Sequence, residues 1–422
     1  MAGLLAIACR PSGENLTQYV DTHIGTGGHG HVFVGANVPF GFVQLGPTSI
    51  PQSWDWCSGY HVTDSTVIGF SHTHLSGTGI GDLFDVTVMP VIGEVTYARG
   101  TEEDQNSGLW SYADRSKEIS VPGYYSVPLT RYGITAEMTA TNRVGLHRYT
   151  FPQSEEAGIV INLMNGGCWD SPMDAQIERV DPMTGQPDPN GQALRGYRYS
   201  RGWADDQKVY FYAEFSKPFK DFKVIRGDIQ IWQDEFKDIA AFAHAYFEAE
   251  QQEQIMMKVA LSPVSMEGAY ANMKAELSGW DFEATAKAAK QVWNEELGKI
   301  KIEGKDKEDL KIFYTALYHA MIAPSTFCDV DGSYRGADGQ TYENPGYQTY
   351  TTFSLWDTYR AAMPLYSIFQ SERYTDMINT MLSIYKEQGK LPVWHLHGCE
   401  TDCMVGNPGI PPVADAIVKG FD

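Results

Sequence analysis

The sequence predicts a multidomain protein that begins with an antiparallel β-sandwich and continues, through a linker helix, into a helical domain. From Tyr124 to about Ser265, short runs of apolar residues alternate with polar ones and are separated by Gly, Pro, Asn and Asp, which is typical of strands that pack on one face. After residue 281 the apolar residues recur at helical spacing instead. The chain has 422 residues, 43% of them hydrophobic, which is enough for more than one domain with a sizeable core.

The alternation is clearest in two segments. In 134–140, Ile, Ala, Met and Ala alternate with Thr, Glu and Thr, and in 209–215, Val, Phe, Ala and Phe alternate with Tyr, Tyr and Glu. Shorter apolar runs at 158–164, 229–232 and 255–262 complete the set. Many short strands between turn residues predict a sandwich of two antiparallel sheets.

Four helices are predicted after the strands. The segment 281–300 is rich in Ala, Glu and Lys, with its apolar residues roughly on one side, and indicates a linker helix. A second helix spans 308–325. A third runs from about 357 to 388 and is expected to break near Pro364, because proline has no N–H to donate inside a helix. A fourth begins near Pro412 and shows no stop signal in the residues that follow.

The charge balance excludes two classes of partner. The chain carries 32 basic and 53 acidic residues, a formal net charge of −21. Nucleic acids and anionic membranes are bound by clustered Lys and Arg, so neither is expected here, and no stretch has the length and apolar character of a membrane span. Aromatic residues make up 13% of the chain, which fits either carbohydrate binding or a large β-rich core.

The N-terminus and the cysteines bear on location. Small and apolar residues run up to Cys9, after which polarity rises. This pattern resembles the end of a bacterial lipoprotein signal, with Cys9 as a lipid anchor, although the basic start is missing and an abbreviated leader without function is the alternative. We expect a periplasmic or cell-surface protein. The six cysteines lack zinc-site spacing, so we expect few or no disulfides, with at most one bridge.

The stretch 351–404 concentrates the groups that a sugar site needs. It opens with Trp356, Asp357, Tyr359 and Arg360, and it closes on a loop containing Trp394, His395, His397, Glu400 and Asp402. An aromatic ring stacks on the apolar face of a pyranose, and charged groups form hydrogen bonds with its hydroxyls. This stretch is therefore the candidate binding site.

Five motifs carry a resemblance to a known family. The run SLWDTYR at 354–360, followed by LPVWHLHGCETDCMVG at 391–406, resembles the family 92 glycoside hydrolases, which are calcium-dependent exo-α-mannosidases. DTHIGTGG at 21–28 and PFGFVQLGP at 39–47 are similar to the opening of that family, and FSHTHLSGTG at 70–79 to a segment close to its substrate pocket. The resemblance covers nearly the whole chain.

The family architecture implies a domain division. It consists of a leader at 1–18, a β-sandwich at 19–278, a linker helix at 279–302 and the first part of an (α/α)6 barrel at 303–422. Such a barrel has twelve helices, which at roughly 12 residues each plus loops need more than about 200 residues, whereas 303–422 supplies 120. We therefore expect a truncated barrel, and the N-terminal portion of a longer family chain.

The resemblance also implies the chemistry. We expect the enzyme to hydrolyse terminal α-linked mannose, with α-1,2 as the common linkage. The reaction should invert the configuration at the anomeric carbon, and a Ca²⁺ ion should bridge two mannose hydroxyls. Inversion needs an acid and a base carboxyl on opposite sides of the sugar. The family places both, and most calcium ligands, in downstream motifs without a counterpart here. No catalytic residue or metal ligand is therefore assigned, and little or no turnover is expected from this chain alone.

The residues that carry over are those that hold the substrate. The resemblance implies that Asp357 binds hydroxyls of the terminal mannose, with Trp356 and Arg360 beside it, and that Glu400 faces the same pocket. An N-terminal charge on a helix for Asp357, and a structural ion pair for Arg360, are the alternatives. Cys399 stands where the family usually has Asn.

Four further residues are assigned to the rim of the same site. By resemblance, Trp56 and Cys57 border the bound sugar, together with Trp54, and His72 and His74 support the rim. A polar turn beneath a sheet edge is the structural alternative for each of them.

Two other functions remain open. One is a non-catalytic protein that binds mannose-containing glycans through the sandwich. The other is a zinc metallohydrolase using His72, His74, His395 and His397, since an HxH pair occurs twice, although no HExxH motif is present.

Overall fold

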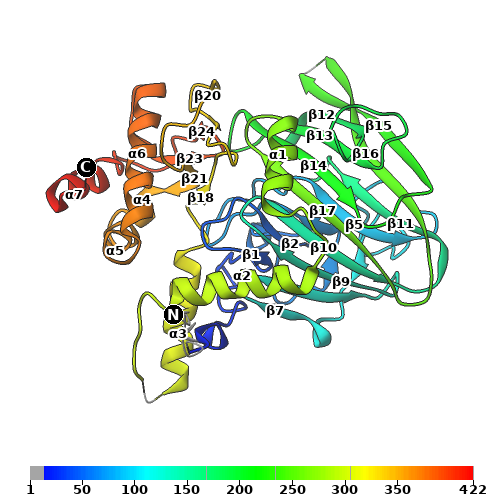
Figure 1. Cartoon of the computed structure of the whole chain (residues 1–422), viewed down its shortest axis with the longest axis horizontal. Helices are drawn as coiled ribbons and strands as arrows, with labels where there is room; N and C mark the ends of the chain where they lie inside the picture. Colours follow the sequence, from blue (N-terminus) through cyan, green and yellow to red (C-terminus); the bar gives the residue numbers. More distant parts are fainter. Residues whose placement is uncertain (1–13, 168, 233, 305, 422) are drawn as a thin grey trace, which may run out of the picture.

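The computed structural model describes residues 14–421 apart from 168, 233 and 305. Figure 1 shows a β-rich part, coloured blue to green, and a helical part, coloured yellow to red, on one side of it. The expected order, an antiparallel β-rich domain followed by helices, is confirmed. No helix in the described part of the chain combines the length and the apolar character needed to cross a bilayer.

Two large antiparallel sheets make up the β-rich part. The seven-stranded sheet contains, in spatial order, β1 (Ala36–Asn37), β2 (Gln44–Thr48), β4 (Gly69–Ser71), β5 (Thr87–Ile92), β11 (Ser154–Asn162), β16 (Glu235–Ala249) and β15 (Asp221–Trp232). The eight-stranded sheet contains β12 (Ser171–Val180), β13 (Ala193–Arg201), β14 (Gln207–Phe215), β17 (Glu253–Ser262), β10 (Val144–Phe151), β9 (Ile134–Ala140), β8 (Tyr124–Leu129) and β7 (Ile119–Val121). One large apolar core joins residues of both sheets.

Burial follows the alternation along most of β9 but not along β14. In β9, Ile134, Ala136 and Met138 are buried in the core, with half-buried residues between them. In β14, Tyr212 and Glu214 are buried as well. Helix α1 (Met266–Glu276) covers that face, so both sides of the strand lose contact with water.

The remaining short elements lie outside the two large sheets. They are the 3-10 helices η1 (Leu16–Tyr19), η2 (Trp54–Trp56) and η3 (Arg115–Lys117), and the strand pairs β3 (Thr66–Val67) with β6 (Ser111–Tyr112), β18 (Ser325–Thr326) with β21 (Tyr350–Thr351), and β19 (Tyr334–Arg335) with β20 (Thr341–Tyr342). A three-stranded sheet contains β22 (Phe353–Ser354), β23 (Trp394–Leu396) and β24 (Cys399–Glu400).

The first two helices after α1 match their predicted segments closely. Helix α2 (Phe282–Leu297) lies within 281–300, and the side chain of Asp281 accepts a hydrogen bond from the N–H of Ala284 at its start, which is a favourable N-cap. Helix α3 (Lys307–Ala320) ends before the predicted boundary at 325. Pro324 explains the earlier end, because the residue before a proline disfavours helical geometry.

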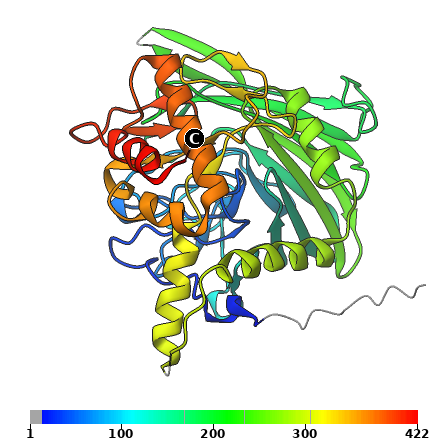
Figure 2. The same cartoon turned by 60° about the vertical axis from the view of Figure 1, so that its left-hand side comes forward.

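The predicted long helix is divided into α4 (Leu355–Thr358), α5 (Ala362–Phe369) and α6 (Ser371–Gln388). The predicted break near Pro364 is confirmed, because residues 359–361 interrupt the helix between α4 and α5, and a second break at Gln370 separates α5 from α6. Pro364 lies in the first turn of α5, where its missing N–H has no partner within the helix to lose. Helix α7 (Ile410–Lys419) ends on Gly420, whose φ of +79° forms a left-handed cap. The sequence therefore does contain a stop signal there. Figure 2 shows α6 and α7 beside each other, and Tyr374 of α6 donates a hydrogen bond to the carbonyl of Pro412.

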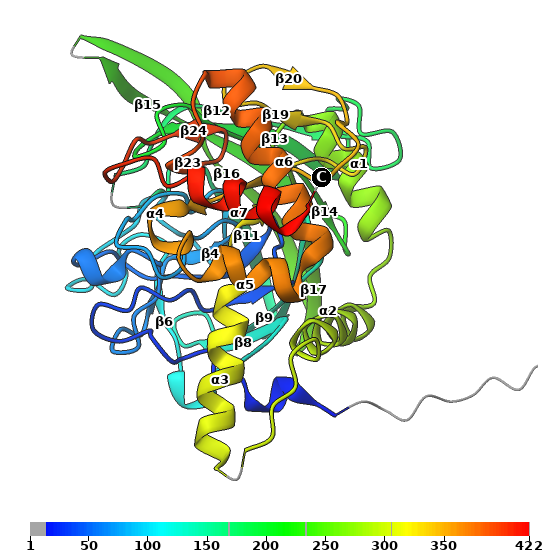
Figure 3. The ribbon, with the colours of Figure 1, turned by 90° about the vertical axis from the view of Figure 1, so that its left-hand side faces the viewer.

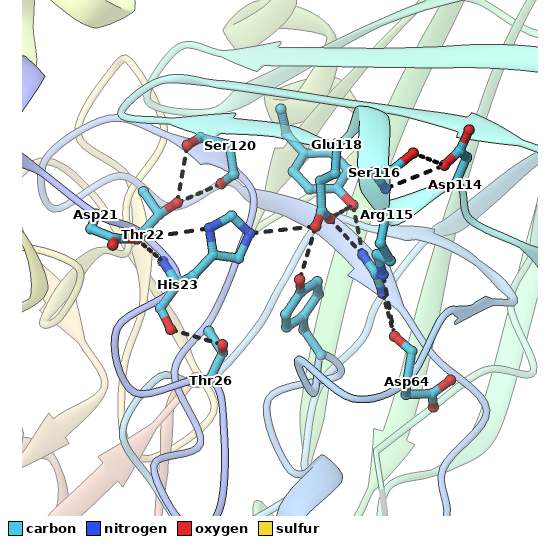
Figure 4. Close-up of polar contacts among 12 residues, drawn as sticks. Asp21, Thr22, His23, Thr26, Asp64, Asp114, Arg115, Ser116, Glu118 and Ser120 are labelled. Carbon is cyan, nitrogen blue, oxygen red and sulfur yellow. Dashed lines mark hydrogen bonds and ion pairs between the residues drawn. The ribbon is translucent and has the colours of Figure 1, made fainter.

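A buried carboxylate fixes the N-terminal segment to the edge of the sandwich. Glu118 accepts hydrogen bonds from Arg115 (Nη1 at 2.5 Å), Tyr125 (hydroxyl at 2.5 Å) and Tyr60 (hydroxyl at 3.0 Å), and His23 Nε2 lies 3.4 Å away. Figure 4 shows His23 and Arg115 approaching Glu118 from opposite sides. Burial raises the pKa of Glu118, but the hydrogen bonds and the charge of Arg115 outweigh it and lower the pKa to about 2.

This network gives a pH-dependent prediction. Because the pKa of Glu118 is lower in the folded than in the unfolded chain, its contribution is complete above about pH 4.5 and is lost as the pH falls toward 2. Replacing Glu118 with Gln should lower the free energy of unfolding by about 2 kcal/mol at pH 7 and by less at pH 3.5. Urea unfolding at both pH values measures this. Glu103→Gln, at an exposed carboxylate, is the control, and an equal loss in both variants would contradict the prediction.

Candidate functional site

A loop of the sandwich meets a hairpin of the helical part. The loop 75–83 contributes Leu75 and Leu83 to a small apolar cluster that also contains Trp394 and Leu396 of β23. The ring centroids of Trp203 and Trp394 are 4.4 Å apart. Strand β23 pairs with β22, which places the segment 354–360 directly beside the hairpin. Figure 3 shows α4 next to β23 and β24.

A polar contact closes the same junction. Arg335 donates to the carboxylate of Asp206 over 3.0 Å, and the thiol of Cys399 donates to the carbonyl of Asp206 over 3.1 Å. The Arg335 side chain is nearly fully buried. The residue that replaces the Asn expected at 399 therefore still makes a hydrogen bond between the two parts of the protein.

Beneath the loop, one guanidinium neutralises two fully buried carboxylates. Arg198 donates from Nη1 to Asp85 over 2.7 Å and from Nη2 to Asp170. Gln207 donates to Asp85 over 2.6 Å, and Ser200 donates to Asp170 over 2.7 Å. Since buried charges are stable only when they are paired and hydrogen-bonded, this network requires Arg198.

A third carboxylate, Asp82, lies at the end of the loop without a cation of its own. Its Oδ2 accepts from the N–H of Ala204 over 3.1 Å, and its Oδ1 is buried without a hydrogen-bond partner. Burial, and then the charge of Asp170, raise the pKa of Asp82 to about 7. The network therefore retains a proton near neutral pH, and Asp82 attaches the end of the loop 75–83 to residue 204.

Two exposed tryptophans flank this loop. Trp54 is 50% exposed and donates from Nε1 to the carbonyl of Gly79 over 2.7 Å. Trp169 is 52% exposed, and its backbone N–H donates to the carbonyl of Gly81 over 3.2 Å. Between them lies a hollow of about 520 Å³, which we call the tryptophan hollow; it is also lined by Pro51, Gln52, Ser53, Arg99, Gly167, Asp170 and Ser171. Indole faces together with amide, hydroxyl and guanidinium groups suit a polyhydroxylated ligand.

The segment 354–360 presents polar groups at the junction. Asp357 is exposed in the first turn of α4, and its Oδ2 accepts from the Ser354 hydroxyl over 2.5 Å. The Arg360 guanidinium lies 5.2 Å from the ring centroid of Trp356. With the described residues Arg360 makes no ion pair, so the structure does not support the ion-pair alternative for it. Asp357 remains accessible to a ligand and also stabilises the N-terminus of its helix.

Comparison with known proteins decides the family. The family model for the glycosyl hydrolase family 92 N-terminal domain matches residues 19–262, and the model for the family 92 catalytic domain matches residues 268–422. The chain belongs to glycosyl hydrolase family 92. The recognition from the five sequence motifs is thereby confirmed.

Solved structures agree with the family assignment. A family 92 α-mannosidase from Bacteroides thetaiotaomicron, solved in complex with mannoimidazole, is 36% identical, with a TM-score of 0.89 over 97% of this chain and 54% of that chain. A family 92 inverting mannosidase from the same organism is 24% identical, with a TM-score of 0.81 over 98% of this chain and 54% of that chain, which supports the fold alone.

A curated relative shows the same partial coverage. An uncharacterized secreted glycosidase of Arthroderma benhamiae is 28% identical over 98% of this chain and 51% of its own length. The chain thus spans about half the length of the family 92 relatives it matches.

The Glu400 side chain binds the backbone of the hairpin. Its carboxylate accepts three backbone hydrogen bonds, from Val393 at 2.8 Å, Trp394 at 2.9 Å and Asp402 at 3.0 Å. Both carboxylate oxygens are used in this way, so the geometry favours a supporting role over the direct sugar contact expected from the family 92 resemblance.

This role of Glu400 is testable. Replacing Glu400 with Ala leaves three backbone N–H groups without their acceptor, which should cost about 1–3 kcal/mol locally. We expect hydrogen exchange at the amides of residues 393, 394 and 402 to become at least tenfold faster. Glu372→Ala, at an exposed position of α6, is the control. Unchanged protection at these amides in the Glu400 variant would exclude the supporting role.

Trp56 and Cys57 shape the turn from which Trp54 projects. The Nε1 of Trp56 donates to Asp64 over 2.6 Å, and its ring stacks on His61 with centroids 4.4 Å apart. Cys57 is fully buried, and its thiol donates to the carbonyl of Trp54 over 2.7 Å. Within the predicted group 54–57, the residue with an open aromatic face is therefore Trp54.

His72 and His74 lie inside the sandwich, so their assignment to substrate binding is corrected to a structural one. Both side chains are at most 2% exposed. His72 donates from Nδ1 to the carbonyl of Val86 over 2.6 Å, and His74 donates from Nδ1 to the carbonyl of Gln44 over 2.7 Å. Burial lowers the pKa of both imidazoles to about 4. They are neutral groups of the framework beneath the site.

The four histidines of the zinc hypothesis do not form a metal centre. The second nitrogen of His72 lies 3.0 Å from His147 Nε2, whereas the ring of His397 packs against Phe42 and Phe327. Among the described residues, no group of three or more His, Cys, Asp or Glu side chains is arranged to hold a metal ion. The zinc hypothesis is therefore wrong for the described part of the chain.

Sequence reasoning missed part of the tryptophan hollow. Of its lining residues, Trp169, Arg99 and Asp170 belong to no motif that was used, and neither do the buried carboxylates Asp82 and Asp85 beneath the loop. The available signal was weak: Trp169 and Asp170 follow a pair of glycines in the segment 165–171, and that pattern alone does not separate an exposed tryptophan from a core one.

Proposed function

We propose that the protein is an exo-α-mannosidase that removes terminal α-linked mannose, in particular α-1,2-linked mannose, with inversion. Membership of family 92 carries this proposal, since the two family models together match residues 19–262 and 268–422. The similar α-mannosidase from Bacteroides thetaiotaomicron, solved in complex with mannoimidazole, supports mannose as the sugar. A relative named as a secreted glycosidase supports action outside the cytoplasm. The lipid anchor at Cys9 lies outside the described residues.

In this proposal the chain supplies the residues that hold the substrate. Trp54 and Trp169 offer indole faces on the sandwich side, and Trp356, Asp357 and Arg360 offer a ring, a carboxylate and a guanidinium on the helical side. The mannose-containing glycan enters between these loops. Helices α3 to α7 belong, in the same proposal, to an (α/α)6 barrel.

The acid and the base are assigned to no described residue. Inversion needs two carboxyl groups about 6.5–9.5 Å apart with a water molecule between them. Asp85 and Asp170 are buried against Arg198, Asp82 is buried under the loop, and Glu400 is used by the backbone. We therefore propose that residues outside the described ones provide the catalytic pair, and that the 422-residue chain alone has little turnover.

Calcium is proposed on the family resemblance only. Oxygen-rich clusters of carboxylates and carbonyls bind Ca²⁺, but the described residues do not form a cluster of three such side chains. No ligand is assigned here, and no chemical step is attributed to the ion.

Binding tests the substrate-holding role without requiring turnover. Isothermal titration of the 422-residue chain with α-1,2-mannobiose should give a saturable signal, and titration with the α-1,2-linked glucose disaccharide should give at least tenfold weaker binding. Equal binding of the two disaccharides, or binding of neither, would contradict a mannose-holding site on this chain.

A further inference from the structure

A second polar hollow lies on the seven-stranded sheet and shares no lining residue with the tryptophan hollow. It has a volume of about 520 Å³ and is formed by the loop after β5, the start of β11, and strands β15 and β16; its lining residues are Gly93, Glu94, Val95, Tyr97, Glu155, Glu156, Lys220, Asp221, Lys223, His244 and Tyr246. Ala243, Ala245 and Phe247 of β16 point into the sandwich core. His244 and Tyr246 therefore project from the opposite face of the sheet.

A glycine makes room for an imidazole on this face. Gly158 of β11 is paired with Tyr246, which is paired in turn with Asp221 of β15. A Cβ atom at position 158 would lie only 2.0 Å from His244 Nε2. The imidazole therefore lies across Gly158, and no other residue type leaves space for it there.

Two tyrosines hold this imidazole in place. The Tyr246 ring is stacked on His244, with centroids 3.8 Å apart and planes 22° apart. The Tyr97 hydroxyl lies 2.9 Å from His244 Nδ1 and 3.1 Å from the Tyr246 hydroxyl. The three side chains form a fixed array of hydroxyl and imidazole groups, which we call the Tyr–His–Tyr array.

The two tyrosines of the array line the hollow, whereas the second nitrogen of His244 is turned toward Gly158. His244 is 2% exposed, and its Nε2 has no hydrogen-bond partner among the described residues. Burial, and then the nearby charge of Lys223, lower the pKa of His244 to about 4, so the imidazole is neutral near pH 7. The array therefore meets a ligand through the Tyr97 and Tyr246 hydroxyls, each of which can both donate to and accept from a sugar hydroxyl.

The charges around the hollow narrow the ligand class. Four carboxylates (Glu94, Glu155, Glu156 and Asp221) stand against two ammonium groups (Lys220 and Lys223), and this excess disfavours an anion. No metal-binding cluster occurs in the described part of the chain. Lys220 is engaged with Glu248 and with the carbonyl of Glu155, whereas Lys223 makes no ion pair with a described residue and lies 5.7 Å from the Tyr97 ring centroid. A neutral polyhydroxylated ligand fits these groups.

We propose that this hollow is a second carbohydrate-binding site, which binds a neutral sugar residue of a mannose-containing polysaccharide away from the tryptophan hollow. Its volume falls in the range of about 300–1,000 Å³ that is common for small-molecule sites. The Tyr–His–Tyr array supplies neutral hydrogen-bonding groups, and Lys223 and Glu94 supply charged ones. Such a site would keep the protein on a polymeric substrate, and it goes beyond the proposed hydrolysis.

Affinity electrophoresis in gels containing soluble α-mannan tests the proposal. Trp54→Ala, which removes an aromatic wall of the tryptophan hollow, should still be retarded. In that background, Lys223→Ala should weaken retardation at least fivefold, and Tyr246→Ala should abolish it. Lys386→Ala, at an exposed position of α6, is the control and should change nothing. Thermal unfolding of each variant checks that the fold is intact.

The proposal is overturned if Trp54→Ala alone abolishes retardation, if Lys223→Ala and Tyr246→Ala are retarded like their parent, or if the unaltered chain is not retarded at all. Lys223 makes no ion pair with a described residue, so Lys223→Ala is expected to leave the fold intact. This variant still tests the proposal if Tyr246→Ala unfolds. Hydrolysis of a disaccharide does not enter this test, so its result is independent of that of the proposed function.

Discussion

Replacing Arg198 with Met should lower the free energy of unfolding by about 3–5 kcal/mol at pH 7. Arg198 is fully buried, and its guanidinium contacts Asp85 and Asp170, which are also buried. Without it these two carboxylates and the neighbouring Asp82 have no cation within the network. They must then take up protons or remain charged in a medium of low dielectric constant. Urea unfolding followed by circular dichroism measures the loss.

The loss should depend on pH with a defined sign. In the variant the folded carboxylates have raised pKa values, so the folded state binds more protons than the unfolded state, and stability falls as the pH rises. The difference from the parent chain should be larger at pH 8 than at pH 5. Arg201→Met, on the same strand but half-exposed beside Asp205, is the matched control and should cost less than about 1 kcal/mol. Similar losses for both arginines would contradict the account of the buried network.

Replacing Trp54 with Ala should weaken the binding of α-1,2-mannobiose at least tenfold. The exposed indole face covers part of the tryptophan hollow, and the loss of about 60 Å² of apolar contact at about 25 cal/mol per Å² corresponds to about 1.5 kcal/mol. Trp169→Ala should have a similar effect from the opposite wall. Isothermal titration of each variant measures the affinity.

Trp54→Phe separates the ring from its hydrogen bond. Phe retains an aromatic face but loses the Nε1 donor to Gly79, so it should recover most of the affinity that Ala loses. If Trp54→Ala binds as tightly as the parent chain, or if Phe is no better than Ala, the tryptophan hollow does not hold the sugar by stacking.

The local alternation of apolar and polar residues was sufficient to predict the fold, but it did not predict which faces of a strand are covered. Alternation in 134–140 correctly marks a strand with one face in the core. In 209–215 the same pattern does not indicate that both faces are buried. Helix α1 packs over Tyr212 and Glu214, although it lies about 50 residues further along the chain. Sequence periodicity reports the conformation of a segment, whereas its burial depends on distant partners.

The same limit explains the site residues. His72 meets His147, 75 residues away, and no local signal distinguishes this buried pair from histidines at a pocket rim. Within 54–57, sequence alone could not tell that Trp56 stacks on His61 while Trp54 remains open. The motif at 354–360 was found because a carboxylate, an arginine and a tryptophan adjacent in sequence stay adjacent at a helix N-terminus.

Mannose release from α-1,2-mannobiose, with calcium and with a chelator, tests the central claim most directly. The protein made from its complete reading frame should release mannose only with calcium, and proton NMR should show the β-anomer of mannose as the first product. The 422-residue chain should bind the disaccharide with little or no release. Release by either protein with retention of configuration, or release that a chelator leaves unchanged, would contradict the account, and binding without release in both would favour the non-catalytic carbohydrate-binding function.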